Sequence, residues 1–186
     1  MAAADQHLNP KIIVGLGNPG AQYERTRHNV GSHIVRAMAA GNAAMFRSER
    51  QCDAHVATCV IGENKIILAT PKTYMNESGR AVQRLLRFFG AIAENLLVVI
   101  DDIETSWGSM KLAFEGGTRG HNGIRSIHQH VGKNFTQLRV GVGHPGGQSV
   151  ADYVLGNFTR EEIEELPQAV ERAISLIEKW VLEPKT

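Results

Sequence analysis

"NLLVVID", at residues 95–101, is the most strand-like stretch of the sequence. Its aliphatic side chains leave no polar face, which is typical of a central strand that is buried on both sides of a sheet. The stretch runs into two consecutive carboxylates, Asp101 and Asp102. Successive side chains of a strand point to opposite faces, so the two carboxylates face different sides. We expect Asp101 to contribute to a site and Asp102 to be a solvated acid or a cap.

Strand-like and helix-like segments alternate on both sides of this stretch. The alternation predicts a single three-layer α/β/α domain with a twisted mixed β-sheet flanked by helices. The domain is expected to span residues 1–186, with residues 1–10 as a loose N-terminal tail. In sheets of this kind, ligands bind beyond the carboxyl ends of the strands. The predicted strands lie at residues 11–16, 53–61, 65–70, 95–101, 109–114 and 137–143, and the predicted helices begin at Asn29 or Ser32, at residue 76, at residue 121 and after Thr159.

The C-terminal helix has a recognisable start. Thr159 and Glu162 stand at the spacing of a capping box, in which each side chain bonds the other's backbone N–H. Pro167 lies inside the expected helix and should break or kink it, because proline has no N–H to donate. The apolar stripe expected to face the core consists of Ile163, Leu166, Val170, Ile174, Ile177 and Val181.

The composition excludes several classes of protein. The 186 residues include 20 Lys and Arg against 19 Asp and Glu, so contact with nucleic acid must come from a local patch rather than from global charge. No apolar run approaches the ~20 residues that span a bilayer, and the N-terminus has no export signal. Cys52 and Cys59 form no C-x-x-C pair, and we expect two reduced thiols in a cytoplasmic protein.

A G-x-G-x-x-G pattern formed by Gly15, Gly17 and Gly20 follows the first predicted strand. In a dinucleotide-binding protein, a helix opens at these glycines and an acidic residue follows ~20 residues later. Here no apolar helical period starts before about Val30, and the later region holds no acid. We therefore expect the glycines to form a sharp turn that carries Asn18 and the following loop over the end of the sheet.

Two of the eight histidines stand apart from the others. His28 and His121 are each followed by asparagine in a loop before a helix. Histidine is the natural base near neutral pH, and a buried carboxylate at a strand end can hold it in one tautomer. We expect His28 to be that base and Asp101 to be its partner.

Loop asparagines complete the constellation. Asn18, Asn76 and Asn122 carry both donors and acceptors, so they can bind a peptide backbone or a water molecule. The sequence shows no serine or cysteine in a nucleophile elbow and no cluster with metal-ligand spacing. The simplest reading is a hydrolase without metal or cofactor, in which His28 activates water directly.

The motifs as a set resemble a known family. "IVGLGNPGAQYERTRHNVG", "PKTYMNESG", "VVIDDIE", "GGTRGHNGIRSI" and "LRVGVGHPG" occur in this order, and from about Lys11 to the C-terminal helix the chain closely resembles bacterial-type peptidyl-tRNA hydrolase. The resemblance implies cleavage of the ester between a peptide and the 3′ ribose of its tRNA. Its expected partner is peptidyl-tRNA, and the expected form is a cytoplasmic monomer.

The resemblance also assigns roles. His28 would be the general base, Asp101 would orient it, and Asn18 would sit beside it and help to distinguish N-blocked peptidyl from free aminoacyl substrates. Aromatic rings would line the channel for the substrate's unpaired end, where stacking is tolerant of sequence. The residues expected to bind substrate or tRNA are Tyr23, Tyr74, Met75, Asn76, Asn122, Lys111 and Arg139.

The chain departs from the family pattern at the expected phosphate clamp. Lys111 and Arg139 are kept, but Ala113 stands where a second basic residue is usual, and Glu104 replaces an aspartate. Arg119 stands where the family usually has glycine, and it can either supply the missing charge or remain a solvent-exposed arginine. An alternative function is a catalytically idle relative that only binds RNA, which the presence of His28, Asp101 and the asparagines disfavours.

Overall fold

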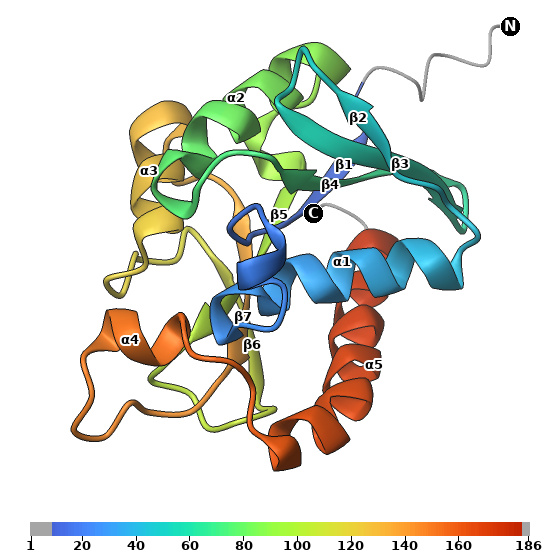
Figure 1. Cartoon of the computed structure of the whole chain (residues 1–186). Helices are drawn as coiled ribbons and strands as arrows, with labels where there is room; N and C mark the ends of the chain where they lie inside the picture. Colours follow the sequence, from blue (N-terminus) through green and yellow to red (C-terminus); the bar gives the residue numbers. More distant parts are fainter. Residues whose placement is uncertain (1–8, 184–186) are drawn as a thin grey trace, which may run out of the picture.

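A seven-stranded β-sheet runs through the middle of the molecule in the computed structural model, which describes residues 9–183 (Figure 1). The strand order is β2-β3-β4-β1-β5-β7-β6. The four central strands β4, β1, β5 and β7 are parallel, whereas the pairs β2–β3, β3–β4 and β6–β7 are antiparallel. The predicted mixed sheet is therefore confirmed. The strands are β1 (Lys11–Gly15), β2 (Arg47–Glu49), β3 (Ala54–Ile61), β4 (Asn64–Pro71), β5 (Leu96–Asp102), β6 (Met110–Phe114) and β7 (Thr136–Gly141).

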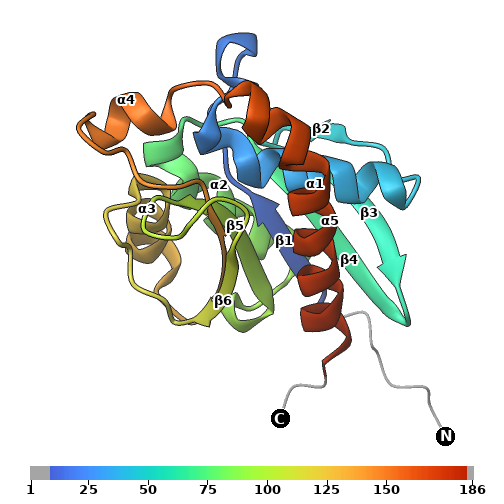
Figure 2. The ribbon, with the colours of Figure 1, turned by 90° about the horizontal axis from the view of Figure 1, so that it is seen from below.

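Helices cover both faces of the sheet, as predicted (Figure 2). On one face lie α1 (Val30–Gly41) and α5 (Arg160–Leu182), and on the other lie α2 (Ser78–Phe89) and α3 (Asn122–Val131). The short helix α4 (Val150–Val154) lies beyond the end of β7. Among the described helices, none is long and apolar enough to cross a membrane. Short 3-10 turns complete the fold at η1 (Ala21–Tyr23), η2 (Arg27–Asn29), η3 (Met75–Glu77) and η4 (Ala93–Asn95).

The central strand β5 separates two hydrophobic cores. Leu97 and Val99 pack in the core beneath α1 and α5, whereas Val98 belongs to the core beneath α2 and α3. All seven residues of β5 are buried, as predicted for a central strand. The same alternation places Asp101 on the row of Val99 and Asp102 on the row of Val98.

The glycines after β1 serve close packing. A Cβ atom at Gly15 would lie 2.2 Å from the carbonyl oxygen of Gly31, and one at Gly31 would lie 2.1 Å from that of Val99. Only glycine lets the start of α1 approach the sheet this closely. Of the three glycines in the pattern, Gly20 alone has a positive φ, at 108°. The helix α1 begins at Val30, ten residues after Gly20, and not at the glycines as in the dinucleotide fingerprint.

The starts of α1 and α5 follow different chemistry. Asn29 occupies the N-cap position of α1, as one of the two predictions had it, and Ser32 lies inside the helix. The Asn29 side chain makes no cap hydrogen bond and instead accepts the backbone N–H of Asn18. The capping box of Thr159 and Glu162 is confirmed.

The predicted break at Pro167 does not occur. The helix α5 runs through this residue, which is exposed, so that the carbonyl group that loses its N–H partner can be solvated. The expected apolar stripe is wrong at its start, because Ile163 is 51% exposed. The smaller side chains of Ala169 and Ala173 face the core instead, in a row with the following residues Ile177 and Val181.

The structure also bears on the expected N-terminal tail and on the two cysteines. The side chain and backbone oxygens of Asn9 accept hydrogen bonds from Ile92 and Asn95, so the chain is anchored from residue 9 onward. The remainder of the expected tail, residues 1–8, lies outside the described residues. Cys52 and Cys59 are free and lie in the two different cores, on opposite sides of the sheet.

Candidate active site

A cavity of about 600 Å³ opens at the carboxyl ends of the central strands. The chain leaving β1 brings Asn18 and His28 to it, the chain leaving β4 brings Tyr74 to Asn76, and β5 ends in it. The predicted residues Asn18, His28, Asn76, Asp101 and Asn122 therefore line one cavity at the expected edge of the sheet. Its wall combines polar groups with an apolar side, the latter formed by Met75, Ile100, Ile103, Val150, Ala151, Val154 and Leu155.

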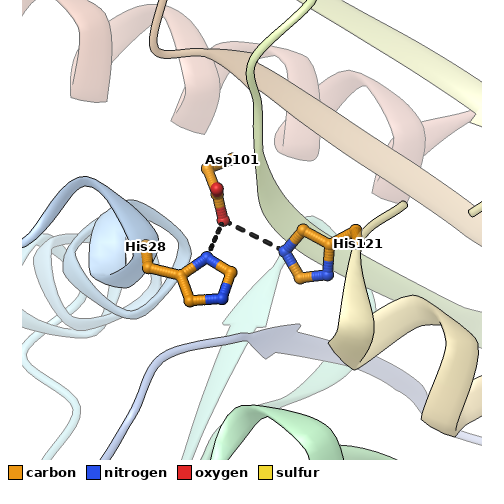
Figure 3. Close-up of side chains that lie close together, drawn as sticks. All are labelled: His28, Asp101 and His121. Atoms are coloured by element: carbon orange, nitrogen blue, oxygen red, sulfur yellow. Dashed lines mark hydrogen bonds and ion pairs between the residues drawn. The ribbon is translucent and has the colours of Figure 1, made fainter. Parts of the chain in front are cut away.

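His28 and Asp101, which are far apart in the sequence, meet at this cavity (Figure 3). Nδ1 of His28 lies 2.8 Å from Oδ1 of Asp101, and the two side chains are 11% and 3% exposed. A carboxylate can only accept, so Nδ1 carries the proton and Nε2 is left as the free, basic nitrogen. This is the geometry expected of a general base whose tautomer is fixed by a carboxylate.

A second histidine contacts the same carboxylate oxygen. Nε2 of His121 lies 3.0 Å from Oδ1 of Asp101 (Figure 3). The other ring nitrogen of His121 caps α3, because Nδ1 accepts hydrogen bonds from the backbone N–H groups of Gly123 and Ile124. The accepting role of Nδ1 requires the proton to be on Nε2, so His121 in this arrangement is neutral and donates to Asp101.

The two histidines determine the charge state of the carboxylate. Burial by itself would raise the pKa of Asp101, but its interactions with His28 and His121 outweigh the burial and hold the pKa well below the ordinary value. Asp101 is therefore an ionised, acceptor-only group at neutral pH. The centroids of the two imidazole rings are 5.0 Å apart.

Asn18 is held with its amide in a defined orientation. Oδ1 of Asn18 accepts the backbone N–H of Met75 at 2.8 Å, which leaves the Nδ2 group as the free donor. The backbone of Asn18 is fixed by both ends of the Asn29 amide, at 2.9 and 3.0 Å. Asn18 therefore presents a preorganised hydrogen-bond donor beside His28.

The other predicted binding residues are arranged along the same wall. Asn76 and Asn122 are exposed and line the cavity, and Oδ1 of Asn122 accepts a hydrogen bond from Arg125, which again leaves the amide donors free. Tyr74 lines the cavity and is 52% exposed. Tyr23 does not line it, but packs edge-to-face on Tyr74 with ring centroids 6.4 Å apart.

Asp102 is part of a buried ion-pair network, not the solvated acid expected from the sequence. It is 5% exposed, and Oδ2 lies 3.2 Å from Arg119 and 3.8 Å from Arg139. The expectation of a solvated acid was wrong because β7 and the loop before α3 cover this end of β5. The alternative of a capping role agrees with the structure, since Asp102 accepts the backbone N–H of Glu104 at 3.0 Å and the hydroxyl group of Thr105 at 3.1 Å. Arg119 also lies 3.5 Å from Glu104, and it has a positive φ of 44° at the position where the family usually has glycine.

The expected phosphate clamp is divided between a buried and an exposed group. The Arg139 side chain is 4% exposed and donates to Gln137 and to the backbone oxygen of Gly117. Burial, followed by the charge of Arg119, lowers the pKa of Arg139 from its usual value. Lys111 lies directly opposite Arg139 in the β6–β7 ladder and is exposed, but it does not line the cavity.

His28, Asp101 and His121 are also the cluster of potential metal ligands within residues 9–183. Their ligand atoms lie within 4.8 Å of one another. The atoms face each other at hydrogen-bond distances, and a coordinated ion needs nitrogen ligands at ~2.0–2.1 Å. An ion placed among them would have to replace both hydrogen bonds to Asp101.

Sequence reasoning missed three members of the site: His121, Asp102 and Asn29. The signal for His121 was present, since it shares with His28 the "HN" step in a loop before a helix. For Asp102 and Asn29 the sequence offered no comparable signal, because their partners come from segments that meet only in the folded chain.

The fold and the site together define an α/β protein with a histidine–carboxylate pair at the carboxyl edge of a mixed sheet, which is a site suited to hydrolysis. The comparisons with known proteins narrow this class. The family model for peptidyl-tRNA hydrolase matches residues 12–185, and the chain belongs to this family. Curated peptidyl-tRNA hydrolases from Lactiplantibacillus plantarum and Mycobacterium ulcerans are 44% and 41% identical, over 92% and 94% of this chain and the same shares of the relatives.

Solved structures agree with the family. Peptidyl-tRNA hydrolase from Acinetobacter baumannii is 34% identical and superposes with a TM-score of 0.86, covering 94% of this chain and 90% of that chain. Purine nucleoside phosphorylase from Toxoplasma gondii has a TM-score of 0.54 at 8% identity and covers 94% of both chains. The latter likeness concerns the fold alone.

Proposed function

We propose that the chain hydrolyses the ester bond between peptide and tRNA in peptidyl-tRNA and in N-blocked aminoacyl-tRNA, releasing free tRNA and peptide. Family membership supports the reaction. The observation that carries the mechanism is the 2.8 Å contact between His28 and Asp101, which assigns the proton of the neutral ring to Nδ1 and makes Nε2 the nitrogen that can take a proton.

In the proposed reaction, water attacks the ester carbonyl carbon while Nε2 of His28 takes a proton from it. The tetrahedral intermediate then collapses, the bond to the 3′ ribose oxygen breaks, and that oxygen receives the proton from His28. A positioned base of this kind contributes ~10²–10⁴-fold. Asp101 stabilises the imidazolium ion that forms, and the Nδ2 group of Asn18 is placed to donate to the peptide or to the developing oxyanion.

Substrate binding is proposed to use the rest of the cavity. Asn76 and Asn122 hydrogen-bond the peptide or the 3′ end, Met75 provides an apolar wall, and Tyr74, backed by Tyr23, stacks on an unpaired base. The basic residues expected to hold tRNA phosphate are Lys111, Arg139 and, in place of the alanine at position 113, Arg119.

The enzyme is further proposed to act as a cytoplasmic monomer without a metal. The hydrogen bond between Nδ1 of His28 and Asp101 gives the base its tautomer without a metal ion. Dialysis against a chelator is therefore expected to leave activity unchanged.

A time course with N-acetylaminoacyl-tRNA tests the function. The wild-type chain should release free tRNA, free aminoacyl-tRNA should be a poor substrate, and His28→Ala should abolish turnover while tRNA binding stays nearly intact. Binding of tRNA without any deacylation above background by the wild-type chain would favour the RNA-binding alternative instead. A wild-type kcat in His28→Ala would refute the assignment of the base.

A further inference from the structure

A second cavity, of about 340 Å³, lies on the other side of Asn18 from the active site. Asn18 lines both cavities, so the second one adjoins the reacting groups. Its polar wall carries four basic side chains and one acidic side chain, that of Glu24. The basic residues are His33 and Arg36 on α1, His55 on β3 and Lys72 directly after β4.

The two permanent cations of this cavity are held by hydroxyl groups. Arg36 donates to Ser32 at 3.3 Å and to Thr70 at 3.5 Å, and Lys72 donates to Ser48 at 3.1 Å. Within the described part of the chain, no carboxylate forms an ion pair with Arg36 or Lys72. Hydroxyl partners orient a cation without neutralising it, so the positive charge remains available to a ligand.

Two arginines elsewhere in the molecule show the other arrangement, in which a carboxylate pairs with the guanidinium group. The guanidinium of Arg27 lies 2.9 Å from Glu162, and that of Arg119 lies 3.2 Å from Asp102. The environment of His55 agrees with an excess of positive charge in the cavity. Burial, and then the charges of Arg36 and Lys72, lower the pKa of this histidine.

We propose that this second cavity binds a backbone phosphate of the tRNA acceptor strand, with Arg36 and Lys72 as its charged ligands. The inference rests on the proposed function, which places the 3′ ribose ester at His28. The phosphate next to that ribose lies within one nucleotide of the reacting bond, and Asn18 is the wall between the two cavities. Phosphate oxygens accept from guanidinium, ammonium and hydroxyl groups together, and this wall offers all three.

The test is the double variant Arg36→Gln/Lys72→Gln, with Arg84→Gln/Arg87→Gln as a control that removes the same charge from exposed positions on α2. We measure kcat and KM for N-acetylaminoacyl-tRNA over a range of salt concentrations. The first variant should raise KM about tenfold, and the slope of log affinity against log salt should fall by ~0.7 for each single-strand phosphate that the variant no longer binds. Its kcat should stay unchanged, and Arg36→Lys/Lys72→Arg should restore KM.

Three results would overturn the proposal. The first is an unchanged KM and salt slope in the double variant, and the second is the same change in the control variant. The third is a KM change that occurs when a given tRNA carries an acidic peptide but not when it carries a neutral peptide, because the cavity would then bind the peptide. The affinity for deacylated tRNA is measured in parallel. It should weaken in the double variant even if the wild-type chain hydrolyses nothing, so failure of the proposed function is distinguishable from failure of the phosphate site.

Discussion

Nε2 of His121 lies 3.0 Å from Oδ1 of Asp101 because the other ring nitrogen of His121 caps α3. The backbone amides at the start of the helix thus select the tautomer that donates to the carboxylate. A proton on Nδ1 would remove the acceptor on which the cap depends. We therefore expect His121 to be a positioning residue that acts on His28 through Asp101.

Replacing His121 tests that role. His121→Ala removes a donor from Asp101, which makes the carboxylate a better partner for a protonated His28, so the apparent pKa in the pH profile of kcat/KM should rise. We expect kcat to fall about tenfold. Loss of the cap should cost ~1 kcal/mol of stability. His121→Asn, which can still cap the helix, should recover stability but not the pH profile; recovery of both would mean that the role is structural only.

Asp101→Asn should change how stability depends on pH. The folded-state pKa of Asp101 is depressed, so its contribution to stability is fully present above the unfolded pKa and is lost as the pH falls toward the folded value. The free energy of unfolding, measured with urea, should therefore decrease below pH ~4 more steeply for the wild-type chain than for Asp101→Asn. Glu94→Gln, which removes an exposed carboxylate, serves as the control. If the free energy of unfolding of the wild type and of Asp101→Asn changes with pH in parallel, the depressed pKa of Asp101 is contradicted.

Arg139 and Arg119 should respond differently to truncation. Arg139→Ala leaves the buried Asp102 with a single cationic partner, the partly exposed Arg119, and breaking a buried ion pair costs ~3–5 kcal/mol. At a temperature where it remains folded, this variant should raise KM more than it lowers kcat. Arg119 is 40% exposed, so Arg119→Gln should cost less than ~1 kcal/mol and still raise KM at low salt. An unchanged KM in Arg119→Gln would remove it from the clamp.

Gly31→Ala should displace His28 by changing how α1 packs on β5. Its Cβ would lie 2.1 Å from the carbonyl oxygen of Val99, so α1 would have to move away from β5. Overpacking of this kind costs ~1–3 kcal/mol, and kcat should fall because His28 moves with the helix start. Gly41→Ala, at the other end of α1 where nothing lies within 4 Å, should leave kcat unchanged. Equal activity of the two variants would disprove the coupling.

Much of this site was predictable because its residues follow strands. The aliphatic run of β5 identified the central strand, and its last residues had to emerge at the carboxyl edge where Asn18 and His28 arrive from β1. Local rules were sufficient for these placements. The capping box of Thr159 and Glu162 was predictable for the same reason, since both partners lie within one helical turn.

The misses concern contacts between distant segments. The burial of Asp102 depends on how β7 and the Arg119 loop cover β5, and no periodicity carries that information. The face of α5 that packs on the sheet is set by how closely the helix approaches. Ala173 is fully buried and Ile163 is 51% exposed. The prediction selected the most hydrophobic side chains, whereas small side chains face the sheet where the helix lies close to it.

The contact between Gly31 and Val99 has a consequence for recognising idle members of the family. Gly31 comes three positions after His28, and Val99 comes two positions before Asp101, so one backbone contact sets the spacing of base and carboxylate. A sequence that retains both of those side chains but carries a bulkier residue at the glycine position should bind its RNA and leave the ester uncut. Surveys that count only the reacting side chains would misclassify such a chain as an enzyme.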